Sequence, residues 1–131
     1  MEFRYFKEKE DYDKLCDWWK FWRFTPPSIE MLPRTGVIVN NDGVDVACGF
    51  LYLTDSKMCW IEFVVSNPLV KDKKVRSECI DSLLNQLCGV AKELEYKIVF
   101  ASIKNENLAN KYIANGFLVG CVNSKELIKI I

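Results

Sequence analysis

Histidine is absent from this chain, and its absence excludes several common kinds of catalytic site. Without an imidazole there is no Ser/His or Cys/His nucleophile pair, and the usual histidine-containing zinc spacings are missing. The six cysteines form no C-x-x-C pair, so a zinc site built from cysteine alone is not indicated either. We therefore expect neither a bound metal nor an activated thiol in the functional site.

Net charge is lacking as well, because eighteen basic residues balance eighteen acidic ones. A balanced chain has no global electrostatic attraction for nucleic acid or for a membrane surface. The longest apolar run is also far too short to span a bilayer. We therefore expect no membrane partner, and nucleic acid is a less favoured partner than a small molecule or a protein.

The cysteines give an indication of the compartment. Most of them lie within apolar runs, and no secretory signal is recognisable before them. We interpret them as reduced and mostly buried side chains that act as small hydrophobic residues. This interpretation predicts a cytoplasmic location.

The length and composition indicate one globular domain, residues 1–131, with half of the residues hydrophobic and 27% charged. Apolar residues at helical spacing predict a helix near the N-terminus, a longer one over residues of about 77–95 after a basic loop at 69–76, and a short one after Asn105. An Asp-Gly pair at residues 42–43 predicts a tight hairpin. Strands are expected at residues 2–6, 36–40, 44–54, 58–66, 98–103, 117–122 and 126–131. This order predicts a mixed α/β sheet with helices on both faces.

The most specific pattern lies near the C-terminus and reads N-E-N-L-A-N-K-Y-I-A-N-G-F over residues 105–117. It resembles the last core motif of the GNAT superfamily of N-acetyltransferases, N-x-x-A-x-x-x-Y-x-x-x-G-F, with Leu108 where Ala is usual. The order of helices and strands is similar over nearly the whole chain. The resemblance implies a GNAT-like fold, with a central, mostly antiparallel, twisted sheet of about six or seven strands. It also implies acetyl-CoA as the co-substrate.

The same resemblance implies that the pyrophosphate of the cofactor binds where the long helix begins. There, backbone N–H groups and basic side chains favour an anion. In the family this loop reads R/Q-x-x-G-x-G/A; here Arg76 takes the first position, and Cys79 and Asp81 replace the two glycines. The alternative is a solvated basic loop that leads into an ordinary helix. The residues of this segment that we interpret as cofactor-binding are Lys73, Lys74, Arg76, Ser77, Glu78, Cys79 and Ile80.

The strand at residues 60–66 corresponds to the central splayed strand of the family. By resemblance it separates from the strand at 98–103 and leaves a V-shaped cleft. Backbone groups of Phe63, Val64 and Val65 then pair with the pantetheine arm of the cofactor, like an added strand. The alternative is that these three are ordinary buried strand residues.

Two side chains are candidates for the chemistry. Tyr112 matches the family tyrosine that lies near the sulfur of the cofactor and can protonate the leaving thiolate. Glu62 lies within an apolar strand, where burial would raise its pKa and suit it to act as a general base, often through water. Regular alternation would place Glu62 on one face of the strand, and Ile61 and Phe63 on the other. The alternatives are a packed tyrosine with a hydrogen-bonded hydroxyl and an exposed glutamate.

Asn105 matches the family's polar residue at a strand end, which hydrogen-bonds the cofactor. Asparagine is also a good helix N-cap, and the two roles are compatible. The remaining unusual segment is W-W-K-F-W-R-F at residues 18–24. We expect Trp19 and Trp22 to pack on the sheet, whereas Trp18, Phe21 or Phe24 are candidates for an acceptor pocket or a subunit contact.

The sequence therefore predicts an N-acetyltransferase that transfers an acetyl group to an amine in a ternary complex, without an acyl-enzyme. The acceptor amine belongs to a small molecule or a protein, and the chain acts as a monomer or a homodimer. The substituted loop keeps a second interpretation open, a catalytically inactive interaction module on the same fold. The interleaved aromatic and basic residues at 18–24 keep a third open, an atypical transferase that modifies nucleobases.

Overall fold

In the computed structural model, which describes residues 1–131, one five-stranded sheet has the order β1-β2-β3-β4-β5. The first four strands are antiparallel neighbours, and β5 runs parallel to β4. The strands are β1 (Glu2–Tyr5), β2 (Gly36–Asn41), β3 (Val44–Tyr52), β4 (Met58–Ser66) and β5 (Ile98–Ala101). The helices are α1 (Glu8–Phe21), α2 (Lys73–Glu93), α3 (Glu106–Ala114) and a short 3-10 turn (Ile29–Met31). This is the mixed α/β architecture that the sequence predicts.

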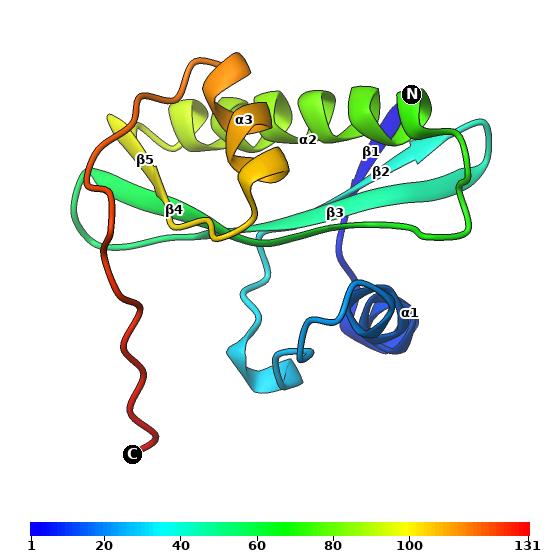
Figure 1. Ribbon diagram of the computed structural model, residues 1–131, viewed down its shortest axis with the longest axis horizontal. Helices are drawn as coiled ribbons and strands as arrows, with labels where there is room; N and C mark the ends of the chain where they lie inside the picture. Colours follow the sequence, from blue (N-terminus) through cyan, green and yellow to red (C-terminus); the bar gives the residue numbers. More distant parts are fainter.

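Helices cover both faces of the sheet. Helices α2 and α3 lie on one face and α1 on the other (Figure 1). Leucines at helical spacing, Leu83, Leu84 and Leu87, bury the inner face of α2 against the sheet. On the opposite face, Leu15 and Trp19 of α1 pack around Phe50. None of the helices has the combined length and apolar composition needed to cross a membrane.

Two local predictions are confirmed. The hairpin between β2 and β3 turns at Asp42 and Gly43, whose φ angles are 53° and 82°. These positive angles are the ones that such a two-residue turn requires. Most cysteines are buried, as expected; Cys88 is half-buried and Cys121 is exposed.

The start of α2 differs from the prediction. The helix begins at Lys73, so residues 73–76 form its first turn and do not belong to a loop. Asp72 explains the earlier start, because its carboxylate accepts hydrogen bonds from the backbone N–H groups of Lys74 and Val75, at 2.9 and 3.4 Å. A side-chain cap of this kind satisfies N–H groups that have no partner within the helix.

The two strands predicted at 117–122 and 126–131 are not formed. The chain after α3 runs away from the sheet without pairing (Figure 1), and its apolar side chains from Leu118 onward are exposed. A strand needs a partner edge, and the free edge of β5 offers only four residues. The sheet therefore has five strands and not six or seven.

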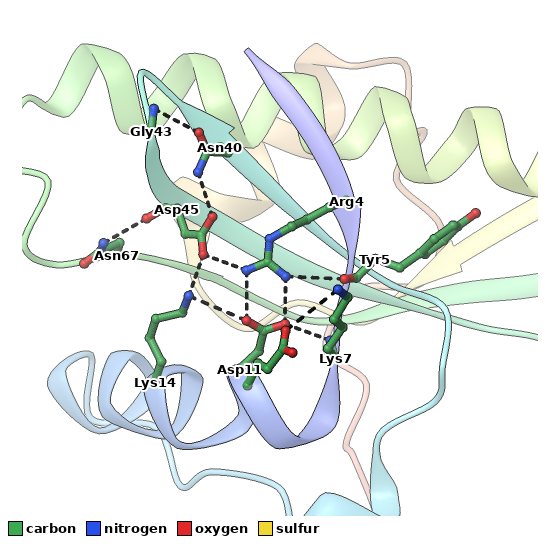
Figure 2. Close-up of polar contacts among 10 residues, drawn as sticks. Arg4, Tyr5, Lys7, Asp11, Lys14, Asn40, Gly43, Asp45 and Asn67 are labelled. Atoms are coloured by element: carbon green, nitrogen blue, oxygen red, sulfur yellow. Dashed lines mark hydrogen bonds and ion pairs between the residues drawn. The ribbon is translucent and has the colours of Figure 1, made fainter.

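A polar cluster fastens α1 to the sheet (Figure 2). Arg4 on β1 donates two hydrogen bonds, of 2.9 and 2.8 Å, to the carboxylate of buried Asp11 and one of 2.7 Å to Asp45 on β3. Asp11 also accepts a hydrogen bond of 2.7 Å from the backbone N–H of Lys7, and Lys14 contacts both carboxylates. Because every buried charge has partners, this cluster orients α1 without leaving an uncompensated carboxylate.

Candidate functional site

The site begins with an irregularity in β4. Register with β3 shifts so that Phe63 and Val64 together face the single residue Gly49. Phe63 has a φ of 58°, the left-handed geometry of a β-bulge. The glycine suits this position, because a Cβ there would lie 3.0 Å from Val64 Cγ2 and 3.1 Å from Leu87 Cδ1.

The bulge coincides with the end of pairing between β4 and β5. The two strands pair from Met58 to Ile61, opposite Ile98 to Ala101, and not beyond. The second half of β4 therefore lacks a neighbour on that side, as expected for a splayed strand. Its main chain is open to an extended ligand that adds as a strand.

A cavity of about 830 Å³ occupies the space between the separated strands. Its wall is formed by β4 from residues 61 to 66, residues 102–105, helix α3, the first turns of α2, and aromatic side chains at and after the end of α1. This volume is within the range of small-molecule and cofactor pockets. Its position at the splay of the sheet makes it the candidate active site.

Tyr112 projects from α3 into the cavity wall and is only 3% exposed. Its ring packs edge-to-face on Phe117, with ring centroids 5.0 Å apart. No protein group hydrogen-bonds its hydroxyl, in contrast to the structural hydroxyl of Tyr96, which bonds both the carbonyl and the N–H of Thr54. Burial, with a smaller contribution from Glu62, raises the pKa of Tyr112 above the usual range of a phenol. Tyr112 therefore stays protonated near neutral pH and is a hydrogen-bond donor.

Glu62 also lines the cavity, and it is half-buried. Burial, and secondarily the negative charge of Glu126, raises its pKa above that of an ordinary glutamate. A half-buried carboxylate with a raised pKa is suited to accept a proton near neutral pH.

The alternation predicted along β4 is wrong beyond Glu62, because the bulge interrupts it. Ile61 belongs to the core cluster under α2, whereas Phe63 packs on the opposite face with α1. Val64 packs with the α2 cluster, and Val65 belongs to the α1 cluster. All four lie along the cavity, since this part of the strand is its edge.

Basic and polar side chains of α2 also line the cavity. They are Lys73, Arg76 and Ser77, and the apolar Ile80 lines it with them. The guanidinium of Arg76 donates a hydrogen bond to the carbonyl of Val70 and lies 5.8 Å from the ring centre of Trp22. Both contacts hold this cation at the cavity rather than free in solvent.

Three other residues of the predicted cofactor segment are not brought to the cavity. Lys74 and Glu78 are exposed and form an ion pair at 3.9 Å along the helix. Cys79 is fully buried in the core between α2 and the sheet. Cys79 lies one turn before Leu83 and therefore on the buried face of α2.

Asn105 lines the cavity and is also the N-cap of α3. Its side-chain oxygen accepts a hydrogen bond of 2.9 Å from the backbone N–H of Leu108. The N-cap alternative is therefore confirmed, and the amide N–H₂ group of Asn105 remains as a donor beside the cavity.

The aromatic residues of segment 18–24 are divided between the core and the cavity differently from the prediction. Trp19 is buried on the sheet as expected, but Trp18 is buried as well and does not line a pocket. Trp22 is 45% exposed, and its indole N–H donates a hydrogen bond of 2.8 Å to the carbonyl of Ser66. Phe24 lines the cavity beside Phe63, whereas Phe21 lies outside it.

Sequence reasoning did not predict five polar residues of the cavity wall, which are Ser66, Ser102, Lys104, Asn107 and Lys111. Lys111 contacts Asp81 of α2 at 2.7 Å, across thirty positions of sequence. Two residues so far apart in the sequence are not related by the periodicity of a helix or a strand, so no pattern predicts their contact. The only signal in the sequence is that Lys111 precedes Tyr112 within the C-terminal motif.

Searches with the sequence matched no protein-family model and no curated protein. Searches with the structure gave many similar folds. A mutant of TTHA1254 from Thermus thermophilus matches with a TM-score of 0.73 and 16% identity, covering 99% of each chain. Rv2747 from Mycobacterium tuberculosis, solved in complex with CoA, matches with a TM-score of 0.70 and 14% identity over 95% of this chain and 76% of that one.

An acetyltransferase from Trypanosoma brucei, Tb11.01.2886, matches with a TM-score of 0.67 and 16% identity over 97% of this chain and 99% of that one. The chain therefore has the fold of the GNAT-type acetyltransferases. The predicted fold class is confirmed, with fewer strands than expected.

Proposed function

We propose that this protein is an acetyl-CoA-dependent N-acetyltransferase that acts on an amine by direct transfer in a ternary complex. The observation that carries the proposal is the cavity at the splay of β4 and β5, which combines an unpaired strand edge, a cluster of cations and Tyr112. The acetyltransferase fold supports the same reading. We assign the cavity to the cofactor and the acceptor together.

The polarity of the wall supports one orientation of the cofactor. The pyrophosphate would lie near Lys73, Arg76 and Ser77, where cations favour phosphate oxygens. The pantetheine arm would follow the open edge of β4 at residues 63–65, pairing with main-chain groups that have no strand partner. Asn105 would donate a hydrogen bond from its amide to this arm.

The proposed chemistry uses the two titratable residues of the wall. Acetyl-CoA supplies the acetyl group as a thioester. Glu62 accepts the proton that the acceptor amine must lose, directly or through a water molecule. Tyr112 donates its hydroxyl proton in a hydrogen bond to the sulfur as negative charge develops there. Because burial raises the pKa of Tyr112, its contribution lies at the low end of general-acid catalysis.

The acceptor in this proposal is an amine of a small molecule or of a protein. Glu62 would attract the ammonium form, and Phe24 and Phe63 would contact apolar parts of the acceptor. The second candidate is an inactive module on the same fold. It is favoured by Asp72, because a carboxylate already occupies N–H groups at the start of α2.

Calorimetric titration with acetyl-CoA, with desulfo-CoA as comparison, separates the two candidates. Saturable binding of both ligands is the expected result, and at about 100-fold excess over the dissociation constant the fold should gain ~2.7 kcal/mol of stability. Absence of both heat and thermal shift would refute the enzyme and leave the inactive module.

A screen of amines for thiol release then tests turnover. We expect kcat/KM to fall on the acid side as Glu62, whose pKa is raised by burial, becomes protonated. Glu62→Gln should remove most activity. The control variant is Glu93→Gln, because Glu93 is exposed and lies at the far end of α2. A Glu62→Gln enzyme with the activity and pH profile of the wild type would contradict the base assignment.

A further inference from the structure

Lys111 joins α3 to α2 through its ammonium group. The group lies 2.7 Å from Asp81 Oδ1 and 2.6 Å from Ser77 Oγ. The side chain is 27% exposed and lines the cavity next to Tyr112. An ammonium group has three N–H donors, so these two contacts leave one donor for a ligand in the cavity.

The backbone of α2 is poorly available to an anion at the same place. The carboxylate of Asp72 caps the N–H groups of Lys74 and Val75, and the N–H of Arg76 bonds the carbonyl of Asp72. An incoming phosphate would have to displace a negatively charged side chain to reach these donors. Side chains, and not the helix N-terminus, are therefore the accessible donors of this wall.

Asp81 adds a second negative charge near the cavity, and its contacts show how the fold compensates for it. Its carboxylate forms an ion pair with Lys111 at 2.7 Å and accepts a hydrogen bond of 2.8 Å from the side-chain amide of Asn115. The charge of Lys111 is thus partly engaged by a carboxylate that is not part of the cavity wall. Removing the carboxylate would leave the cation for the ligand.

Resting on the proposed function, we infer that Lys111 is a cofactor-binding residue that holds the pyrophosphate of CoA from α3, together with Ser77, and that Asp81 competes with the phosphate for it. The cation replaces the backbone donors that Asp72 occupies. This assignment predicts opposite effects for the two partners of one ion pair. A purely structural tie between α2 and α3 predicts losses for both.

The test measures CoA affinity by calorimetry, and the melting temperature, for four proteins: the wild type, Lys111→Met, Asp81→Asn and the control Lys97→Met. Lys97 is exposed and lies outside the cavity. Loss of a charge-assisted hydrogen bond should weaken CoA binding about tenfold or more in Lys111→Met. Removal of a nearby negative charge should tighten it about two- to fivefold in Asp81→Asn. Lys97→Met should bind as the wild type does.

The outcomes separate this inference from the proposed function. No CoA binding by the wild type would overturn both. Wild-type binding that Lys111→Met leaves unchanged, or weakening by Asp81→Asn in parallel with Lys111→Met, would overturn the role of Lys111 alone. If Lys111→Met does not fold, Asp81→Asn still decides, since the introduced amide keeps a carbonyl oxygen for Asn115 and only the tighter binding supports the inference.

Discussion

Replacing Tyr112 by phenylalanine removes one oxygen atom from the wall of the cavity, and the structure defines what else should change. The hydroxyl has no protein partner, so its loss leaves no donor or acceptor unsatisfied. The free energy of unfolding should therefore stay within about 0.5 kcal/mol of the wild type. A hydroxyl with a structural hydrogen bond would instead contribute about 1 kcal/mol.

Turnover should fall much more than stability. General acids typically contribute about 10²- to 10⁴-fold, and the raised pKa of Tyr112 moves the expectation to the low side of this range. We expect kcat for acetyl transfer to fall by more than about tenfold, with CoA affinity nearly unchanged. Thiol release measures kcat, calorimetry measures CoA affinity, and urea unfolding measures the free energy of unfolding.

Tyr96→Phe is the matched control. Its hydroxyl donates to the carbonyl of Thr54 at 2.6 Å and accepts from the N–H at 3.0 Å, outside the cavity. This variant should lose about 1–2 kcal/mol of stability and keep the turnover of the wild type. Full turnover by Tyr112→Phe, or a loss of turnover explained by unfolding, would refute the assignment of Tyr112 as proton donor.

Three further changes have defined outcomes. Arg76→Glu should weaken CoA binding because it reverses a charge at the cavity wall; an affinity equal to that of the wild type in calorimetry would move the phosphate site elsewhere. Gly36→Ala should destabilise the fold by about 1–3 kcal/mol in urea unfolding, since its Cβ would lie 2.5 Å from Phe50 Cε2. Although burial raises the pKa of Asp45, hydrogen bonds lower it to about 2, so this folded-state pKa lies below the ordinary 3.8. The stability that the Asp45 carboxylate gives the fold is present above this ordinary value and is lost as the pH falls toward 2. The midpoint of urea unfolding should therefore change less with pH across this window in Asp45→Asn than in the wild type.

The parts of the fold that follow local rules could be predicted. The hairpin at Asp42–Gly43 and the inner face of α2 depend on turn geometry and on helical spacing, which neighbouring residues specify. Tyr112 and Asn105 could be found because the C-terminal motif keeps them in a fixed order. The sequence also correctly indicates a splayed β4, through resemblance and not through any property of the strand alone.

The parts that depend on long-range contacts could not be predicted. The cap at Asp72 sets the start of α2 at Lys73, before the predicted start. Pairing between Lys111 and Asp81 needs two helices to meet, which no spacing encodes. The last two predicted strands have suitable composition, but strand formation also requires an edge of matching length.

The bulge at Phe63 also changes which alternate residues of β4 face α2. Up to Ile61 the odd-numbered side chains of β4 face α2, as Cys59 does, whereas beyond the bulge Val65 faces α1. The side chains of β4 that face α2 are therefore odd-numbered before the bulge, whereas the even-numbered Val64 faces α2 after it. Regular alternation through residue 63, without the bulge, would turn the outer half of β4 over and exchange the faces of Val64 and Val65. The extra residue thus lets Val64 pack under α2 and Val65 pack under α1 while β4 stays paired with β3.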